Sequence, residues 1–368
     1  MSLNISDTVR VISGKNAVID NAGLLKEFGK KCLIVTGKGS AVKSGALDNI
    51  KTALESEKID YSLFDEITEN PKTSDCFAAG NRARESGADF IVGIGGGSPL
   101  DAAKAVAVYA SNPQISSPDL IYCVPIENEP LPVVLIGTTA GTGSEVTCVS
   151  VLTNGKGKKK SVKGKNYYAS LVFADSKYTY SLPYSVTVST ALDALCHASE
   201  SYLSNKATTD SGQFSEKAIT VLWGELVSLL ETGKTPDEEN RDLLYDASLY
   251  AGAAINITGC CFPHTVGYYL TEKHGVSHGR ACAVFLAEYV KRGLEFKNEK
   301  ALRLLGIMGT DFERFEKTVL ALADVKININ EEELEEYLPN WENAANFDNS
   351  PGGFTKEDAK TLFEKLFL

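Results

Sequence analysis

The sequence predicts two domains of different class: an α/β domain with a parallel sheet over residues 1–183, and an all-helical domain over residues 184–368. In the first part, short apolar and β-branched runs alternate with helical stretches, which is typical of a parallel sheet covered on both faces by helices. Beyond residue 183 helical patterns dominate, and no run of comparable β character follows. A chain of 368 residues is long enough to bury two hydrophobic cores.

The elements of the first domain follow from apolar runs that end at glycine or at a turn. Strands are expected at 31–36, 61–64, 90–94 and 132–136. Helices are expected between them, including 77–86 and 100–110, and Asn70 with Pro71 marks a turn. The lysine-rich stretch 156–165 predicts an exposed hairpin turn.

The second domain is predicted from helical periodicity alone. Helices are expected at 185–204, 211–232, 238–257, 279–293 and 298–323. A last helix is expected to begin at Thr355, whose hydroxyl can cap it, with Asp358 three residues further on.

Composition excludes several classes of protein. The net charge is −11, from 37 basic and 48 acidic residues, which disfavours a nucleic-acid partner. No apolar run approaches the roughly 20 residues that cross a bilayer, and residues 1–7 lack a secretion signal, so we expect a cytoplasmic protein without a membrane partner. The eight cysteines are scattered without a Cys-x-x-Cys pair, and the sequence assigns them no chemical role beyond reduced core residues.

A glycine-rich turn follows the predicted strand 90–94. Gly95, Gly96 and Gly97 let backbone amides approach a ligand closely, and Ser98 is expected to cap the helix that Pro99 begins. The free N–H groups of such a helix start favour phosphate. A tight turn without a ligand is the alternative, because Ser98 stands where the dinucleotide fingerprint has its third glycine.

A second polar loop follows the strand 132–136. It carries four threonines, at 138, 139, 142 and 147, which suit hydrogen bonds to ribose, phosphate or a carboxamide. Open α/β sheets bind ligands at the carboxyl ends of their strands. The two loops together therefore favour a nucleotide over an unusually polar connection.

The four histidines, at 197, 264, 274 and 278, all lie in the helical half. Asp193 and His197 are four residues apart, so on a helix both face the same side. One carboxylate and several imidazoles suit Fe(II), Zn(II) or a similar divalent ion. An exposed helix pair and a simple turn around His278 are the alternatives.

These motifs, in this order, resemble the iron-containing (group III) alcohol dehydrogenase family, and the resemblance covers nearly the whole chain. It rests on the segments 95–104, 138–147 and 193–200 and on His264 with His278 and Gly279. The family implies a Rossmann-like domain followed by a helical domain, the dehydroquinate synthase-like architecture, with a divalent metal in the cleft between them. It also implies hydride transfer between NAD(P)(H) and a primary alcohol or aldehyde.

The resemblance assigns site residues by motif. The implied ligands of one Fe(II) or Zn(II) ion are Asp193, His197, His264 and His278. The implied cofactor positions are Gly37, Ser40, Asn70, Gly95, Gly96, Gly97, Ser98, Asp101, Thr138, Thr139, Thr142 and Leu182.

Within the family, segments 35–40, 178–183 and 270–275 are similar to the butanol dehydrogenase and NADPH-dependent aldehyde reductase branch. Relatives that prefer NAD tend to carry an aspartate where Gly37 stands. A carboxylate there would repel a 2′-phosphate. The sequence therefore favours NADP(H) over NAD(H).

One position departs from the family pattern. Many relatives have a histidine, implicated in proton transfer, four residues after the third metal ligand, and here that residue is Tyr268. A tyrosine hydroxyl has an unperturbed pKa of about 10 rather than about 6.5. Tyr268 and the spare His274 are therefore the two candidates for the proton path.

Two other functions stay open on the sequence alone. A dehydroquinate synthase-like lyase also uses NAD and a metal, although its glutamate and two histidines fit Asp193 and His197 poorly. A relative that binds nucleotide and metal without turnover is the second alternative. The expected partners are a small alcohol or aldehyde and further copies of the chain, as a homodimer or larger assembly.

Overall fold

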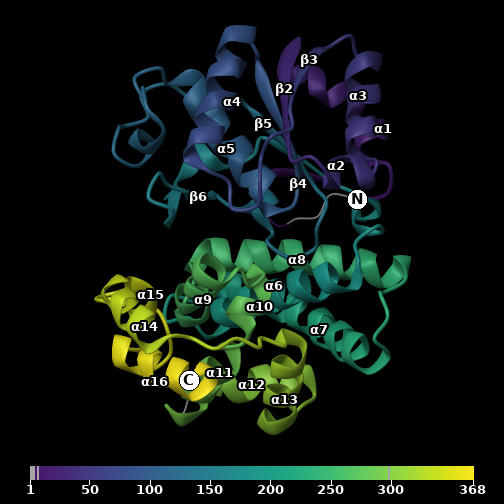
Figure 1. Cartoon of the computed structure of the whole chain (residues 1–368). Coiled ribbons are helices and arrows are strands. Elements are labelled where there is room, and N and C mark those ends of the chain that lie inside the picture. The colour runs from purple at the N-terminus through teal and green to yellow at the C-terminus, as the bar shows by residue number, and fades with distance from the viewer. Residues whose placement is uncertain (1–4, 6–7, 297–298) are drawn as a thin grey trace. The chain divides into compact units, whose positions relative to one another are not determined.

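The computed structural model describes residues 5, 8–296 and 299–368 (Figure 1). The chain divides into two compact units. The first contains Met1–Leu182 and Asp237–Tyr245, and the second contains Pro183–Pro236 and Asp246–Leu368. The short segment Asp237–Tyr245 thus joins the first unit although it lies far along the chain.

A parallel sheet of six strands forms the centre of the first unit, in the order β1-β8-β5-β4-β2-β3. These strands are β1 (Arg10–Ser13), β2 (Lys31–Thr36), β3 (Asp60–Phe64), β4 (Phe90–Gly95), β5 (Val133–Gly137) and β8 (Leu171–Ala174). Every residue of β4 and β5 is buried, as expected for central parallel strands. The predicted strands are confirmed, whereas the short edge strand β1 and strand β8 had no sequence prediction.

The strand order reverses between β2 and β4. The chain passes from β2 outward to β3 and then returns to β4 on the other side of β2. In the register of the sheet Thr36 lies beside Ile94, and Gly95 lies beside Gly137. The carboxyl ends of β2, β4 and β5 therefore meet at a topological switch point, which is where open α/β sheets bind ligands.

Helices cover both faces of this sheet (Figure 1). The helices and turns of this unit are α1 (Ala17–Asp20), η1 (Ala22–Glu27), α2 (Ser40–Lys43), α3 (Ala46–Ser56), α4 (Thr73–Ser86), α5 (Gly97–Ser111), η2 (Pro118–Tyr122), η3 (Ser144–Val146), η4 (Lys165–Tyr167) and η5 (Ser176–Thr179). Apolar side chains of α1, η1 and α3 pack with Ile34 and Val92 in one core. Helices α4 and α5 approach closely, because a Cβ on Gly80 would lie 2.4 Å from the Cβ of Tyr109.

A separate antiparallel hairpin joins β6 (Val149–Thr153) to β7 (Lys159–Lys163). The expected hairpin at 156–165 is therefore present. Its turn is shorter than predicted, because the lysines from 159 onward are paired in strand β7.

The second unit is built from helices. They are α6 (Tyr184–Leu203), α7 (Thr209–Thr232), the later part of α8 (Glu238–Thr258), α9 (Phe262–His274), α10 (His278–Ala283), α11 (Leu286–Glu295), α12 (Glu299–Met308), α13 (Phe312–Ala323), α14 (Glu331–Tyr337), η6 (Leu338–Trp341), α15 (Ala345–Asp348) and α16 (Lys356–Phe367). The cap predicted at Thr355 is confirmed, since Thr355 and Asp358 form a capping box.

Two predicted helices are each two helices in the structure. The segment predicted at 298–323 begins at a residue outside the described ranges and is broken between α12 and α13, where Gly309 has a φ of 63° and Asp311 caps the next helix. The segment at 279–293 is divided at Val284 and Phe285. Helix α9 was missed, because Pro263 and Gly267 are residues typical of turns.

The structure confirms the predicted fold class, a parallel-sheet domain followed by a helical domain. Within the described residues, none of the helices combines the length and apolarity that crossing a bilayer requires.

Candidate active site

The glycine turn connects strand β4 to helix α5. Gly95 has a φ of 151°, and a Cβ there would lie 2.5 Å from the ring of Pro99, so only glycine fits. The prediction that Ser98 caps the helix was wrong, because α5 already begins at Gly97 with Gly96 as its N-cap. The Ser98 hydroxyl instead accepts a hydrogen bond from the backbone N–H of Asn70 at 3.1 Å.

The threonine loop packs directly against this turn. The N–H of Thr138 donates to the carbonyl of Gly95 at 2.8 Å. A Cβ on Gly96 would lie 3.1 Å from Thr139, and one on Gly97 would lie 2.7 Å from Thr142. The structure therefore brings the two predicted cofactor loops together into one surface at the carboxyl ends of β4 and β5.

Asp101 lies in the first turns of α5 and has partners within the protein for both carboxylate oxygens. Ser144 donates to Oδ1 at 2.5 Å, and the N–H of Val151 donates to Oδ2 at 2.9 Å. The buried ammonium of Lys104 lies 3.6 Å away and donates to Ser144 and Thr147. Burial raises the pKa of Asp101 and lowers that of Lys104. Asp101 thus ties α5 to the end of the threonine loop.

The remaining predicted cofactor residues, Gly37, Ser40 and Leu182, lie in other parts of the first unit. Gly37 follows strand β2, and a Cβ there would lie 2.8 Å from the carbonyl oxygen of Ile67. Ser40 is the first residue of the short helix α2. The carbonyl of Leu182 accepts a hydrogen bond from the buried guanidinium of Arg241 at 2.8 Å.

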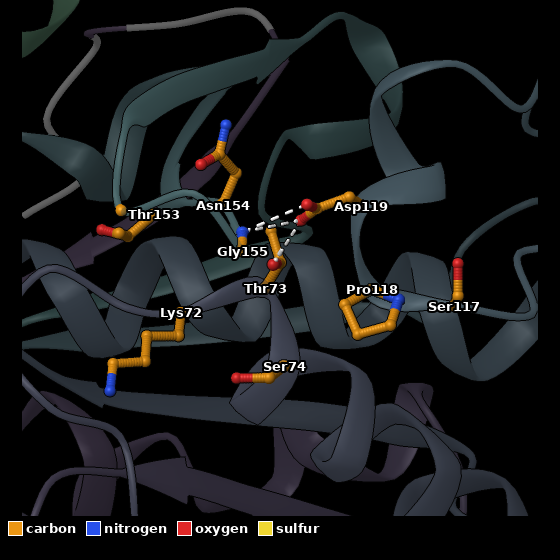
Figure 2. Close-up of a pocket in the computed structure, with 10 residues that line it drawn as sticks. Lys72, Thr73, Ser74, Ser117, Pro118, Asp119, Thr153, Asn154 and Gly155 are labelled. Atoms are coloured by element: carbon orange, nitrogen blue, oxygen red, sulfur yellow. Dashed lines mark hydrogen bonds between the residues drawn. The ribbon is translucent and has the colours of Figure 1, made fainter.

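A cavity of about 540 Å³ lies beside these loops in the first unit (Figure 2). Its lining comes from the start of α4, from η2 and from the turn after β6: Lys72, Thr73, Ser74, Ser117, Pro118, Asp119, Thr153, Asn154, Gly155 and Gly157. Figure 2 shows that the carboxylate of Asp119 accepts hydrogen bonds from Thr73 and from the N–H of Gly155. This carboxylate therefore connects the start of α4 to the turn after β6. Thr153 also donates to the carbonyl of Asn70, which joins this wall to the glycine turn.

The four predicted metal ligands lie on three helices of the second unit. Asp193 and His197 are on α6, His264 is on α9, and His278 begins α10. Glycine allows these helices to approach closely. A Cβ on Gly279 would lie 1.8 Å from the carbonyl oxygen of Ser189 in α6. The first turn of α10 is therefore held against the turn of α6 that carries Asp193.

Donor atoms of Asp193, His264 and His278 converge. Asp193 Oδ1 lies 3.4 Å from His264 Nε2 and 3.8 Å from His278 Nε2. Both Asp193 Oδ1 and His264 Nε2 are buried, and neither has a hydrogen-bond partner within the part of the chain that the structure describes. A four-coordinate ion at about 2.0–2.3 Å from its ligands separates neighbouring donor atoms by roughly 3.3–3.8 Å. The spacing and the unsatisfied atoms fit a divalent cation.

The sequence prediction overlooked Glu200, one turn after His197 on α6. Its fully buried carboxylate lies 2.5 Å from His264 Nδ1 and accepts the N–H of Cys261 at 2.6 Å. An ionised carboxylate can only accept, so Nδ1 donates to Glu200 and Nε2 is the ring nitrogen that faces Asp193. The sequence spacing could have identified Glu200, because it follows Asp193 by seven residues and so lies on the same face of the helix.

Charge within the cluster favours an ionised Asp193. Burial opposes ionisation, but the neighbouring His197, His278 and His264 outweigh it and hold the pKa of Asp193 below its usual range. An ionised carboxylate among imidazoles is a suitable set of ligands for a cation.

His197 is placed differently from the other three. Its ring stacks on that of His264, with centroids 4.5 Å apart and planes 12° apart. Among the described residues, one metal-competent group consists of Asp193, His264, His278 and Cys282, and an adjoining group consists of His197, Cys260 and His264. The two groups share His264.

The two proton-path candidates, both on α9, lie in different surroundings. The ring of Tyr268 stacks on His278, with centroids 5.5 Å apart, and burial raises the pKa of its hydroxyl. His274 ends α9 and packs on Tyr269, which belongs to an aromatic cluster with Trp341. The structure thus brings Tyr268, and not His274, against a predicted ligand.

A switch-point sheet with glycine and threonine loops suits a nucleotide, and a buried carboxylate–imidazole cluster suits a divalent metal ion that takes part in catalysis. Residues 8–176 match the family model for iron-containing alcohol dehydrogenase, and residues 187–367 match the C-terminal model of the Fe-containing alcohol dehydrogenase family. The chain belongs to the iron-containing alcohol dehydrogenase family.

Individual relatives agree with this assignment. Sulfoacetaldehyde reductase of Bilophila wadsworthia is 35% identical over 282 residues, which are 75% of this chain and 72% of that protein. The 1,3-propanediol dehydrogenase of Citrobacter freundii is 34% identical over 287 residues, 76% of this chain and 72% of that protein. These relatives support an alcohol or aldehyde oxidoreductase over the lyase alternative.

Solved structures extend the similarity over almost the whole chain. An iron-containing alcohol dehydrogenase of Thermotoga maritima has a TM-score of 0.89 at 35% identity and covers 97% of both chains. Sulfoacetaldehyde reductase of Bifidobacterium kashiwanohense, solved in complex with NAD+, has a TM-score of 0.84 at 26% identity and covers 98% of this chain and 96% of that one.

Proposed function

We propose that this chain is a metal-dependent aldehyde reductase and alcohol dehydrogenase that uses NADP(H) in preference to NAD(H). The first unit would bind the dinucleotide on its glycine and threonine loops. The second would hold one divalent ion through Asp193, His197, His264 and His278. The expected substrates are primary alcohols and the corresponding aldehydes, which is also the chemistry in the names of the relatives.

The proposal is carried by the convergence of donor atoms around Asp193. Asp193 Oδ1 and His264 Nε2, two buried atoms that lack a hydrogen-bond partner among the described residues, lie 3.4 Å apart. Leaving such atoms unsatisfied is costly, and a cation would satisfy both. Glu200 fixes the tautomer that leaves Nε2 able to bind it.

Several residues of the chain have separate roles in the proposed reaction. The bound ion would polarise the substrate oxygen, and the nicotinamide would donate or accept the hydride. Glu200 orients His264, and Asp101 with Lys104 holds the threonine loop against the glycine turn. Tyr268 is the residue we assign to the proton path, since its ring lies against His278.

The cofactor preference is supported at the end of strand β2. Residues 37–40, Gly-Lys-Gly-Ser, contain no acid that would repel a 2′-phosphate, and the exposed Lys38 adds a positive charge. Because a side chain at position 37 would meet the carbonyl of Ile67, a Gly37→Asp variant also disturbs the backbone. The preference is therefore best tested on the wild-type chain.

The test uses the purified full chain loaded with Fe2+ or Zn2+. Oxidation of NADPH and of NADH by butyraldehyde, sulfoacetaldehyde and lactaldehyde is followed by absorbance, and metal content is measured in parallel. We expect turnover with at least one aldehyde, with a higher kcat/KM for NADPH. His264→Ala should lose both metal and turnover. Full activity of a metal-free His264→Ala protein would refute the proposed function.

A further inference from the structure

The first turns of helix α8 belong to the sheet unit, although the chain reaches them only after α7. This part of the helix, residues 237–245, is called the α8 segment below. Its Arg241 and Tyr245 are both almost fully buried, so their polar atoms need partners within the protein. Those partners lie in two stretches of the first unit that carry predicted cofactor residues.

Tyr245 supports the threonine loop where it leaves the sheet. The Tyr245 hydroxyl donates to Oε1 of the buried Glu145 at 3.2 Å. A Cβ on Gly137 would lie 1.9 Å from the same Oε1 and 2.7 Å from the Tyr245 hydroxyl, so both groups lie against the carboxyl end of β5. Thr138 follows directly and donates its N–H to the carbonyl of Gly95 at 2.8 Å. The Tyr245–Glu145 pair therefore adjoins the strand end that connects the threonine loop to the glycine turn.

Arg241 supports a second stretch of chain, residues 179–182, at the end of the sheet domain. Its guanidinium donates to the carbonyl of Thr179 at 2.7 Å and to that of Leu182, a predicted cofactor residue, at 2.8 Å. The guanidinium is a rigid planar fork of N–H donors, so two carbonyls bound to it are held at a fixed separation. One buried side chain thus fixes the path of the backbone across this stretch.

We propose that Tyr245 and Arg241 of the α8 segment are positioning residues for the dinucleotide: Tyr245 holds the threonine loop through Glu145, and Arg241 holds residues 179–182. The inference rests on the proposed function, because it requires that these stretches bind the cofactor. Both residues act through the chain that they hold and not by touching the cofactor. When either contact is lost, the stretch it holds populates other conformations, and the apparent affinity for the dinucleotide falls with the fraction of molecules that stay competent to bind.

Direct measurement of cofactor binding tests the role of Tyr245. Calorimetric titration of the metal-loaded full chain with NADPH, and in parallel with NADH, gives the Kd of each variant. Tyr245→Phe, which removes only the hydroxyl, should raise the Kd of the better-bound cofactor about tenfold, the effect expected from losing one buried hydrogen bond to a carboxylate. Tyr250→Phe, the same change on the same helix but in the second unit, is the matched control and should bind as the wild type does.

A double-mutant cycle and a second variant test the two contacts separately. If Tyr245 acts through Glu145, the Tyr245→Phe change should weaken NADPH binding no further in a Glu145→Ala background. Arg241→Lys, which keeps the charge but loses the fork of donors, should raise the Kd several-fold by itself. In Tyr245→Phe and Arg241→Lys, kcat at saturating cofactor should stay within about twofold of the wild type, because neither residue belongs to the metal centre. Circular dichroism checks that each variant is folded.

The outcomes separate this inference from the proposed function. A wild type that binds a dinucleotide, with folded Tyr245→Phe and Arg241→Lys variants of the same Kd, would overturn the inference and leave the proposed function standing. Variants with an unchanged Kd and a reduced kcat would also overturn it, because the two side chains would then act after the cofactor has bound. A wild-type chain that binds neither NADPH nor NADH would overturn both.

Discussion

Single side chains decide which atoms of the helical unit are able to bind a cation. Glu200 has no place in the ligand set, yet it determines the protonation of His264 through a contact of 2.5 Å. Tyr268 is placed against His278 by ring stacking, whereas His274 lies with the aromatic cluster on another side of α9. Each of these roles can be removed with a near-isosteric change.

We expect Glu200→Gln to weaken metal binding about 10–100-fold. The glutamine amide can donate to His264 Nδ1, which favours the tautomer with its proton on Nε2, and a protonated Nε2 cannot bind a cation. Metal affinity by titration with a competing chelator measures the effect. Glu216→Gln on α7, whose partners include Tyr202, is the matched control. An affinity equal to wild type in Glu200→Gln would show that the contact does not orient His264.

We expect Tyr268→Phe to lower kcat by about 100-fold or more while leaving metal content unchanged, because the ring still stacks on His278 and only the hydroxyl is lost. Steady-state kinetics with NADPH measures the change. Tyr269→Phe, the neighbouring variant on the same helix, should retain activity, since the hydroxyl of Tyr269 is buried in the aromatic cluster and has no hydrogen-bond partner in the described ranges. Full activity of Tyr268→Phe would show that another group transfers the proton.

Whole helices are positioned by contacts that only glycine permits. Gly279 allows α10 to touch α6, and Gly267 allows α9 to approach α10, since a Cβ there would lie 2.8 Å from the carbonyl oxygen of Ala281. These two crossings bring His264 and His278 toward Asp193. The metal cluster therefore depends on helix packing as much as on its ligands.

A pair of glycine substitutions tests this dependence. Gly279→Ala should cost about 1–3 kcal/mol of unfolding free energy through overpacking and should impair metal retention. Gly224→Ala, inside α7 where nothing lies within 4 Å of the new methyl group, should stabilise the protein by about 0.5–1 kcal/mol. Denaturant unfolding and metal analysis measure both. Unimpaired metal retention in Gly279→Ala would contradict a positioning role for the crossing.

The sequence predicted these elements unevenly, for physical reasons. Buried runs such as β4 and helices with a full capping box such as α16 carry strong local signals. Helix α9 was missed because tertiary contacts, and not local propensity, make Gly267 compatible with a helix. At the site, the motifs and their spacing identified Asp193 and His264 as candidate residues. The position of Cys282 close to Asp193 depends on how α10 packs, and no local sequence pattern predicts it.

At the scale of the whole molecule, each unit carries a different part of the proposed site, and each should respond to its own ligand. The dinucleotide loops belong to the first unit and the candidate metal centre to the second. A ligand that binds the native state stabilises the region that holds it. Stability measurements therefore report on the two parts separately.

We expect a chelator to lower the melting temperature of the metal-loaded wild type by roughly 5–10 °C, because a ligand at 100 times its Kd contributes about 2.7 kcal/mol. Differential scanning calorimetry, combined with metal analysis, measures the shift. His264→Ala should melt at the same temperature with and without chelator. A wild type that loses its metal without any change in melting would argue against a centre that links the three helices.

Helix α8 limits how the two units can be exchanged between relatives by recombination. Its first turns belong to the sheet unit, where Arg241 donates to the carbonyls of Thr179 and Leu182 and Tyr245 donates to Glu145. The halves are thus not interchangeable modules: a chimera spliced at residue 183 would receive this supporting segment from the wrong parent. Recombination between relatives would succeed more readily if residues 237–245 travelled with the sheet.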